Sequence, residues 1–166
     1  MLDVAAVARV LGLAADVCTI EGLPLERWSA GNAFAYVPVR RLEALRRCRI
    51  DLARFNAAVG DDGHAAAFVF CRETIDAANA FHARMFAPDA GVLEDPATGS
   101  AAAAFAGYLT VHGGYANGDR LIRIEQGHEM GRPSLMALQI RIAGGRLTAA
   151  SIGGDAVVVS EGTIEV

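Results

Sequence analysis

The pattern of apolar and polar residues in the first part of this chain indicates short helices mixed with strands. Apolar residues recur at helical spacing, with charged or polar side chains between them, in three segments: residues 3–11, 40–49 and 51–59. Short runs rich in apolar residues indicate strands at 33–39, 65–71 and 80–86. The run at 65–71 is continuously apolar, which is typical of a strand buried on both faces.

The last third of the chain has a different pattern. Its apolar residues alternate with polar ones in short runs, and glycine pairs separate several of these runs. Alternation with period two and glycine-rich turns are typical of antiparallel strands joined by hairpins. The expected strands lie at residues 121–125, 135–142, 146–152, 156–160 and 163–166. We therefore expect an α+β fold with a mostly antiparallel sheet.

One expected helix, at residues 101–111, has no polar face. Residues 101–109 are all apolar apart from Gly107 and Tyr108. A helix that is apolar all round must be covered all round. At ~12 residues it is about 18 Å long, too short to cross a membrane but long enough to form the axis of a small domain. We expect the strands that follow to curve around it as a central hydrophobic helix.

The segment before this helix, E-D-P-A-T-G-S at residues 94–100, combines an acidic side chain with a helix start. Pro96 favours an extended Asp95, and the T-G-S that follows supplies caps and a permissive backbone. The free amides at a helix start attract an anion, commonly a carboxylate or a phosphate. Since Asp95 precedes that end by one turn, the sequence places an acid group beside a candidate anion site.

Two interpretations of Asp95 stay open at this point. Burial raises the pKa of a carboxyl group by up to ~3–5 units, whereas a helix start lowers it by about one. A buried Asp95 would therefore exchange protons near neutral pH and act as an acid or base. A solvent-exposed Asp95 would be a simple hydrogen-bond acceptor, and the whole segment an ordinary helix cap.

Composition narrows the function classes. The 166 residues are 53% hydrophobic and 20% charged, which is typical of a folded domain, and we expect residues 1–166 to form a single one. The net charge of −4 argues against nucleic-acid binding through a basic face. All 15 basic residues are arginine, and the absence of lysine excludes a pyridoxal-phosphate Schiff base and a G-x-x-x-x-G-K phosphate loop.

Cysteine and histidine spacing gives no sign of a metal site or a disulfide framework. Cys18, Cys48 and Cys71 lie far apart, and no H-x-x-x-H or H-x-H pair occurs. We therefore expect free thiols, no metal and no cofactor. The first residues lack the basic start of a signal peptide, and the apolar runs fall short of the ~20 residues of a membrane span. These features predict a cytoplasmic protein with no membrane partner.

Four motifs resemble a known family. E-D-P-A-T-G-S-A at residues 94–101 is similar to the signature of the PhzF, or phenazine biosynthesis-like, family, which is related in fold to diaminopimelate epimerase. Further family-like segments occur in the expected order: A-R-M-F-A-P-D-A-G at 83–91, Q-G-x-x-M-G-R-P-S at 126–134 and a glycine-bounded segment at 152–162. The resemblance covers roughly residues 30–166.

This resemblance implies two similar halves, each with a sheet wrapped around a central helix, and an active site between them. It implies an isomerase or epimerase that removes and returns a proton on a small carboxylate substrate without cofactor or metal. On the matched positions, Asp95 would be the catalytic residue near the reacting carbon, and Thr98, Gly99 and Ser100 would bind the substrate. Since diaminopimelate epimerase-like proteins have a cysteine where Asp95 stands here, a two-thiol mechanism is not implied.

The chain also departs from the family pattern. Family members are usually nearly twice as long, and their first half carries a G-H-A-T signature and a catalytic glutamate. Here only G-H-A-A occurs, at residues 63–66, and it precedes the A-R-M-F motif instead of following it. We therefore expect the C-terminal half alone, completed by a second copy in a homodimer or by a separate N-terminal half. The alternatives are a non-catalytic carboxylate-binding or structural domain, and a truncated family member that lacks the acid/base glutamate.

Overall fold

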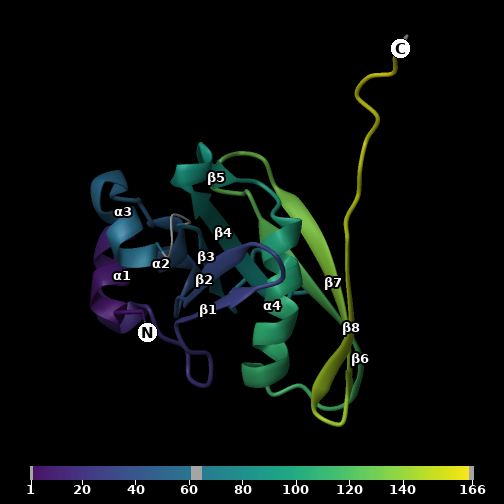
Figure 1. The fold of residues 1–166 in the computed structure, drawn as a ribbon, viewed down its shortest axis with the longest axis horizontal. Coiled ribbons are helices and arrows are strands. Elements are labelled where there is room, and N and C mark those ends of the chain that lie inside the picture. Colours follow the sequence, from purple (N-terminus) through teal and green to yellow (C-terminus); the bar gives the residue numbers. More distant parts are fainter. Residues whose placement is uncertain (1, 61–64, 165–166) are drawn as a thin grey trace.

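A computed structural model describes residues 2–60 and 65–164, and in it a curled sheet encloses one long helix and carries three short helices on its outer side (Figure 1). The helices are α1 (Val4–Val10), α2 (Leu42–Arg46), α3 (Leu52–Val59) and α4 (Gly99–His112), with short 3-10 turns at Ala15–Val17 and Pro88–Ala90. The strands are β1 (Glu26–Ser29), β2 (Ala33–Pro38), β3 (Ala67–Cys71), β4 (Phe81–Ala87), β5 (Val92–Asp95), β6 (Gly118–Gln126), β7 (Ser134–Ala143) and β8 (Arg146–Gly153).

Within these ranges the sheet has eight strands in the order β1-β2-β3-β4-β6-β7-β8, with β5 paired to β4. The expected antiparallel pairing is confirmed for β6, β7 and β8. The sheet as a whole is mixed, however, because β2 is parallel to β3 and β4 is parallel to β6. Two helices separate β2 from β3 in the chain, and β5 with α4 separates β4 from β6. Such long crossovers return the chain in the same direction.

The inner core forms around α4, as the apolar sequence of that helix predicts. This helix packs against β1 and β2 on one side and against β7 and β8 on the other. The buried Phe105 ring lies 5.3 Å from the Tyr36 ring and 4.9 Å from the Phe70 ring. Gly107 leaves room for Trp28, whose indole would lie 3.0 Å from an added Cβ. The cover of α4 therefore comes from strands before it as well as from those that follow it.

A second core lies on the outer side of the sheet. Val37 of β2 and Val69 of β3 pack there with Leu45 of α2 and Phe55 of α3. Alternate side chains of the same strands point inward to α4. Because both faces are covered, β3 is buried along its whole length, and the sequence prediction for this strand is confirmed.

The three cysteines belong to this outer core. Cys18, Cys48 and Cys71 are buried and form no disulfide. Burial raises the pKa of the Cys18 thiol to about 11 and those of the Cys48 and Cys71 thiols to about 12. They therefore stay protonated near neutral pH, which makes them poor nucleophiles.

Two expected elements differ from the structure. The helix expected over 40–49 shortens to α2, because the backbone oxygens of Arg46 and Cys48 accept hydrogen bonds from the Arg84 side chain. The predictions of a strand at 156–160 and of a strand beginning at residue 163 are wrong for the described residues. Residues 154–164 are extended but pair with no described strand, so they lie outside the sheet.

The rest of the last expected strand, 165–166, and Gly63 and His64 of the G-H-A-A segment lie outside the described residues. Among the described helices, none combines the length and the apolar character that crossing a membrane requires.

Candidate active site

The predicted site residues lie along the turn that joins β5 to α4. Asp95 ends β5 and is half-buried, and Thr98 is buried immediately before α4. Gly99 and Ser100 are exposed in the first turn of the helix. The Thr98 hydroxyl donates a hydrogen bond of 2.6 Å to Oδ2 of Asp95. The turn thus holds the Asp95 carboxylate close to the start of α4.

The Thr98 side chain does not cap α4. It occupies the N-cap position of α4, but its side chain makes no capping hydrogen bond. Its hydroxyl donates to Asp95. A side-chain cap accepts a hydrogen bond from a helix amide, whereas the Thr98 hydroxyl oxygen accepts one from Nε2 of Gln126. The capping interpretation is therefore wrong for the Thr98 side chain.

Gln126, the last residue of β6, holds this turn in place and was not expected as a site residue. Its Nε2 donates to the backbone oxygen of Asp95 at 2.6 Å and to Oγ1 of Thr98 at 2.9 Å. Its Oε1 accepts from the Thr98 amide at 3.4 Å. Gln126 is fully buried, so these bonds take the place of water. Its only sequence signal is its position at the start of the family-like segment 126–134.

Gly127 allows the connection after β6 to approach this turn closely. Its φ is 81°, in the left-handed region that glycine tolerates. An added Cβ would collide with the backbone oxygen of Arg132 and lie 2.9 Å from that of Pro96. The backbone around Pro96 is therefore packed directly against the β6–β7 connection.

A cavity of about 490 Å³ opens beside the turn. Asp95, Thr98 and Ser100 line one side of it, and Phe34 and Met85 contribute apolar surface. Asp89, in the segment 83–91, also lines the cavity and accepts a hydrogen bond from the side chain of Asn56. A mostly apolar cavity with a few polar groups is typical of a small-molecule site.

The start of α4 adds an anion-accepting end to this cavity. The first amides of any helix have no acceptor inside the helix, and the helix dipole favours negative charge there. Gly99 itself lies against β8, where an added Cβ would be 3.9 Å from Cγ2 of Ile152. The arrangement therefore sets the Asp95 carboxylate beside helix amides that can hold an anion.

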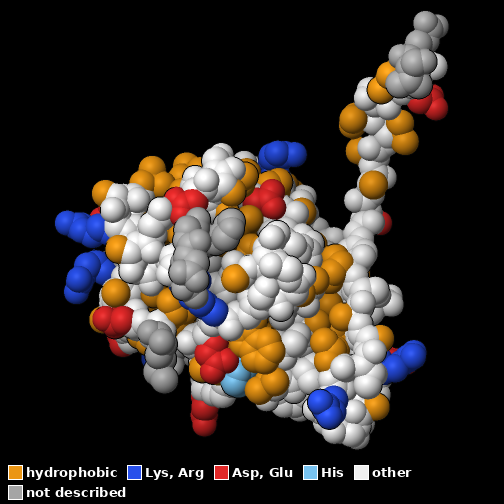
Figure 2. All heavy atoms as spheres, viewed as in Figure 1, with side chains coloured by type: hydrophobic (Ala, Val, Ile, Leu, Met, Phe, Trp, Pro, Cys, Tyr) orange, Lys and Arg blue, Asp and Glu red, His pale blue; other side chains and the backbone are white. Residues whose placement is uncertain are grey.

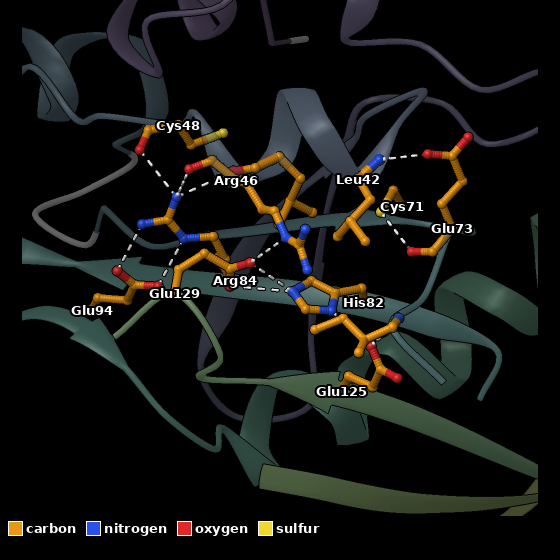
Figure 3. Close-up of polar contacts among 12 residues, drawn as sticks. Leu42, Arg46, Cys48, Cys71, Glu73, His82, Arg84, Glu94, Glu125 and Glu129 are labelled. Carbon is orange, nitrogen blue, oxygen red and sulfur yellow. Dashed lines mark hydrogen bonds and ion pairs between the residues drawn. The ribbon is translucent and has the colours of Figure 1, made fainter. Parts of the chain in front are cut away.

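A buried ionic cluster lies on the outer side of the sheet and is formed by His82, Arg84, Glu94, Glu125 and Glu129 (Figure 3). Arg84 of β4 donates through Nε and Nη2 to the two carboxylate oxygens of Glu94, both at 2.8 Å. Its Nη1 donates to the backbone oxygens of Leu45 and Cys48. Since Glu94 directly precedes Asp95, this ion pair ties the end of β5 to β4 and to α2.

His82, on the same face of β4, lies between two carboxylates (Figure 3). Its Nδ1 is 2.8 Å from Glu125 and its Nε2 is 3.0 Å from Glu129. Burial by itself would lower the pKa of His82, but hydrogen bonds and negative charge from Glu129 and Glu125 outweigh it and raise the pKa. For Glu125 the two effects have the opposite signs. Burial by itself would raise its pKa, but hydrogen bonds, chiefly from Asn79 and two backbone amides, lower the pKa to about 2.

A larger cavity, of about 650 Å³, adjoins this cluster and is not lined by the predicted site residues. Its charged lining consists of Arg46, Arg49, Arg84, Glu94 and Glu129. Arg46 pairs with Glu129 at 3.6 Å, and Arg84 pairs with Glu94. Arg49 donates to the backbone oxygens of Arg46 and Cys48. Because the other four charges pair with one another, we assign the cluster a structural role. The candidate active site is the smaller cavity, where a carboxylate meets a helix start.

This chain is similar to proteins of one family. The family described as "Phenazine biosynthesis-like protein" matches residues 2–162, so the match includes N-terminal residues that the motifs did not cover. An uncharacterized isomerase of Mesorhizobium japonicum is 41% identical over 165 residues, which are 98% of this chain and 55% of that protein. A trans-2,3-dihydro-3-hydroxyanthranilate isomerase of Pseudomonas chlororaphis is 44% identical over 84 residues, 51% of this chain and 30% of that protein.

The fold also matches a solved structure. The crystal structure of the Bacillus anthracis phenazine biosynthesis protein of the PhzF family aligns with a TM-score of 0.77 at 24% identity. The alignment covers 87% of this chain and 50% of that one. Most of this chain therefore aligns with these proteins, but it spans only about half the length of the curated relatives and of the solved structure.

Proposed function

The chain belongs to the phenazine biosynthesis-like family, and from that membership we propose that it is one lobe of an isomerase or epimerase. The proposed reaction moves a proton on a small carboxylate substrate without a cofactor. The observation that carries the proposal is the Asp95 carboxylate, held by Thr98 beside the start of α4 in a cavity of about 490 Å³. Relatives named as isomerases, at 41% and 44% identity, support this reaction class.

Each predicted site residue has a role in this proposal. Asp95 takes a proton from, or gives one to, the reacting carbon of the substrate. The amides of Gly99 and Ser100, with the Ser100 hydroxyl, bind the substrate carboxylate at the helix start. The Thr98 hydroxyl orients the Asp95 carboxylate through its 2.6 Å hydrogen bond.

The proposal includes a second lobe across the cavity. We propose that residues 1–166 form a single domain, which corresponds to the C-terminal half of a two-lobed protein with the diaminopimelate epimerase-like fold. A second copy of this chain or a separate N-terminal half would then supply the opposing acid or base. The length of the relatives, about twice the part matched here, supports this arrangement. The three free cysteines are consistent with a reducing compartment such as the cytoplasm.

Proton transfer to carbon can be tested by solvent deuterium incorporation. The chain, alone and with the remaining half of the Mesorhizobium japonicum relative, is incubated in heavy water with trans-2,3-dihydro-3-hydroxyanthranilate and with other small carboxylates. Mass spectrometry then measures carbon-bound deuterium. Asp95→Asn should abolish incorporation, whereas the exposed Asp16→Asn should leave it unchanged. Equal incorporation by both variants would contradict the role of Asp95.

The second candidate is a carboxylate-binding domain without catalysis, including a truncated family member that lacks the glutamate. The position of Ser100 and the helix amides at the cavity favours it, because these groups bind an anion whether or not Asp95 acts. In that case Asp95→Asn would retain carboxylate binding, measured by calorimetry, and the wild-type protein would incorporate no deuterium with either partner.

A further inference from the structure

Neighbouring residues at the ends of two strands point to opposite faces of the sheet, since successive side chains of a strand alternate between its faces. At the end of β5, Glu94 lines the outer cavity of about 650 Å³, whereas Asp95 lines the inner cavity of about 490 Å³. At the end of β6, Glu125 contacts His82 on the outer side, whereas Gln126 donates to the Asp95 backbone oxygen. Each outer glutamate is therefore one residue away from a group that forms the candidate active site.

Backbone pairing by itself holds the end of β5 loosely. Within the described residues, β5 is four residues long and pairs only with β4. Their register has two partner pairs, Met85 with Asp95 and Ala87 with Val92, and it shifts between them. A short strand with an irregular register leaves its last residue free to move, so a fixed position for Asp95 requires further contacts.

Arg84 of β4 supplies the first of these contacts. It donates to both carboxylate oxygens of Glu94 at 2.8 Å, and its Nη1 donates to the backbone oxygens of Leu45 at 3.1 Å and Cys48 at 3.0 Å (Figure 3). Basic side chains extend from the face of the molecule shown in Figure 2, whereas the Arg84 side chain is buried. A planar guanidinium with this many bonds has one orientation, so it fixes Glu94 relative to α2.

His82 of β4 supplies the second contact. Its Nδ1 is 2.8 Å from Glu125 and its Nε2 is 3.0 Å from Glu129 (Figure 3). The Glu125 carboxylate also accepts hydrogen bonds from two backbone amides between β3 and β4, at 2.9 and 2.8 Å. Because Glu125 directly precedes Gln126, these bonds fix the strand end from which Gln126 reaches Asp95.

Stability alone does not explain a buried ionic cluster. Apolar side chains of similar volume often stabilise a core as well or better, because no charge has to be desolvated. Hydrogen bonds differ in that they are directional and fix distances and angles. A reacting group has to be held within about 0.5 Å of its productive position, and a misplacement of about 1 Å can slow a reaction about 100-fold. A cluster of directional bonds therefore suits the task of holding a reacting group in place.

We infer that Arg84 and His82 are positioning residues for the proposed reaction: Arg84 holds Asp95 through Glu94, and His82 holds it through Glu125 and Gln126. Neither side chain lines the cavity beside Asp95, so both act through the sheet and not on the substrate. The inference rests on the catalytic role proposed for Asp95. It predicts variants that lose turnover while they keep their stability.

The first test replaces the ion pair by apolar residues, in Arg84→Met/Glu94→Leu. The backbone oxygens of Leu45 and Cys48 keep other donors, the Cys48 amide at 3.1 Å and Arg49 at 2.8 Å. The unfolding free energy from denaturation should therefore stay close to that of the wild type. In the deuterium assay, kcat should fall at least about tenfold. KM should be unchanged, because the proposed substrate carboxylate binds at the start of α4.

His82→Gln tests the second contact. Glutamine donates from one atom, whereas His82 bonds through both ring nitrogens, so kcat should fall at least about threefold with KM unchanged. The matched control is Val37→Ala, which removes buried apolar contacts in the outer core and lowers stability. It should keep the wild-type kcat at a temperature at which every variant is folded. An unchanged kcat in a test variant would overturn the inference for the residue that it changes.

A second measurement needs no substrate. The Thr98 amide donates to Oε1 of Gln126 at 3.4 Å, so its hydrogen exchange reports whether the turn is held. The reference is the Val39 amide, which donates to the Phe70 oxygen at 2.7 Å and reports global unfolding. In both test variants, exchange at Thr98 should accelerate at least about tenfold more than exchange at Val39. Equal acceleration at the two amides, or none at Thr98, would overturn the inference.

Two further outcomes have defined meanings. If the apolar pair does not fold, Arg84→Lys takes its place in both measurements, because lysine keeps the charge but loses the bidentate contact. If the wild-type protein incorporates no deuterium, the proposed function is wrong. The exchange at Thr98 then still decides whether Arg84 and His82 hold the turn that carries Asp95.

Discussion

Gln126 and Asp95 are 31 residues apart in sequence, yet the Gln126 side chain donates a hydrogen bond of 2.6 Å to the backbone oxygen of Asp95. The same amide group donates to Thr98, whose hydroxyl in turn donates to the Asp95 carboxylate. The position of the candidate catalytic group therefore depends on a strand that follows α4. This network gives the first two predictions.

Gln126→Ala should destabilise the protein and displace the β5–α4 turn. The variant leaves the Thr98 amide and the Asp95 backbone oxygen without their buried partner, which costs about 1–3 kcal/mol of unfolding free energy. Chemical denaturation measures this loss. Gln139→Ala, at an exposed position of β7, is the control and should change the unfolding free energy by less than about 0.5 kcal/mol. An equal loss of unfolding free energy in both variants would show that the hydrogen bonds of Gln126 do not stabilise the protein.

Thr98→Val should slow the proposed proton transfer while preserving the fold. Valine has nearly the same shape but cannot donate to Asp95, so the carboxylate loses its orienting contact. We expect a decrease in rate of about tenfold, equivalent to about 1.4 kcal/mol in the barrier, and recovery in Thr98→Ser. The initial rate of deuterium incorporation measures it. Thr110→Val, which removes a hydroxyl bonded within α4, should leave the rate unchanged.

Arg84→Ala should be among the most destabilising single substitutions on the outer side of the sheet. The side chains of Arg84 and Glu94 are 6% and 14% exposed, so loss of the guanidinium leaves a poorly solvated carboxylate. Removing one partner of a buried ion pair costs about 3–5 kcal/mol. Thermal and chemical unfolding measure the loss. Arg141→Ala breaks an exposed pair with Asp119 and should leave the stability nearly unchanged.

Stability should depend on pH through His82. Its pKa is raised in the folded protein, so the folded state binds the proton more tightly than the unfolded state. The stabilisation is complete below the ordinary pKa of 6.5 and is lost as the pH rises through the higher folded pKa. The unfolding free energy, measured from pH 6 upward, should therefore fall. His82→Gln should flatten that decline, and an equally steep decline in the variant would rule out His82 as its source.

Some of the fold could be predicted from the sequence because its signals are local. The apolar run of α4 has no face that tolerates water, so it predicts an enclosed helix wherever the rest of the chain goes. The alternation in β6, β7 and β8 likewise predicts adjacent antiparallel strands. The glycine pair at 144–145 joins β7 to β8 by a tight turn, and residues 127–133, between β6 and β7, are too few for a parallel crossover. The segment E-D-P-A-T-G-S places Asp95 before a helix start through the local effects of proline and glycine.

Tertiary structure alone decided the rest, because it depends on contacts between distant segments. The parallel pairing of β4 with β6 brings Gln126 to Asp95, and nothing near either residue encodes that approach. The same sheet turns His82 and Arg84 toward acidic partners on other elements. The sequence of residues 156–159 determines a preference for a strand, but a strand needs a neighbour to satisfy its backbone hydrogen bonds. Whether residues 156–159 form a strand therefore depends on the segment that packs beside them.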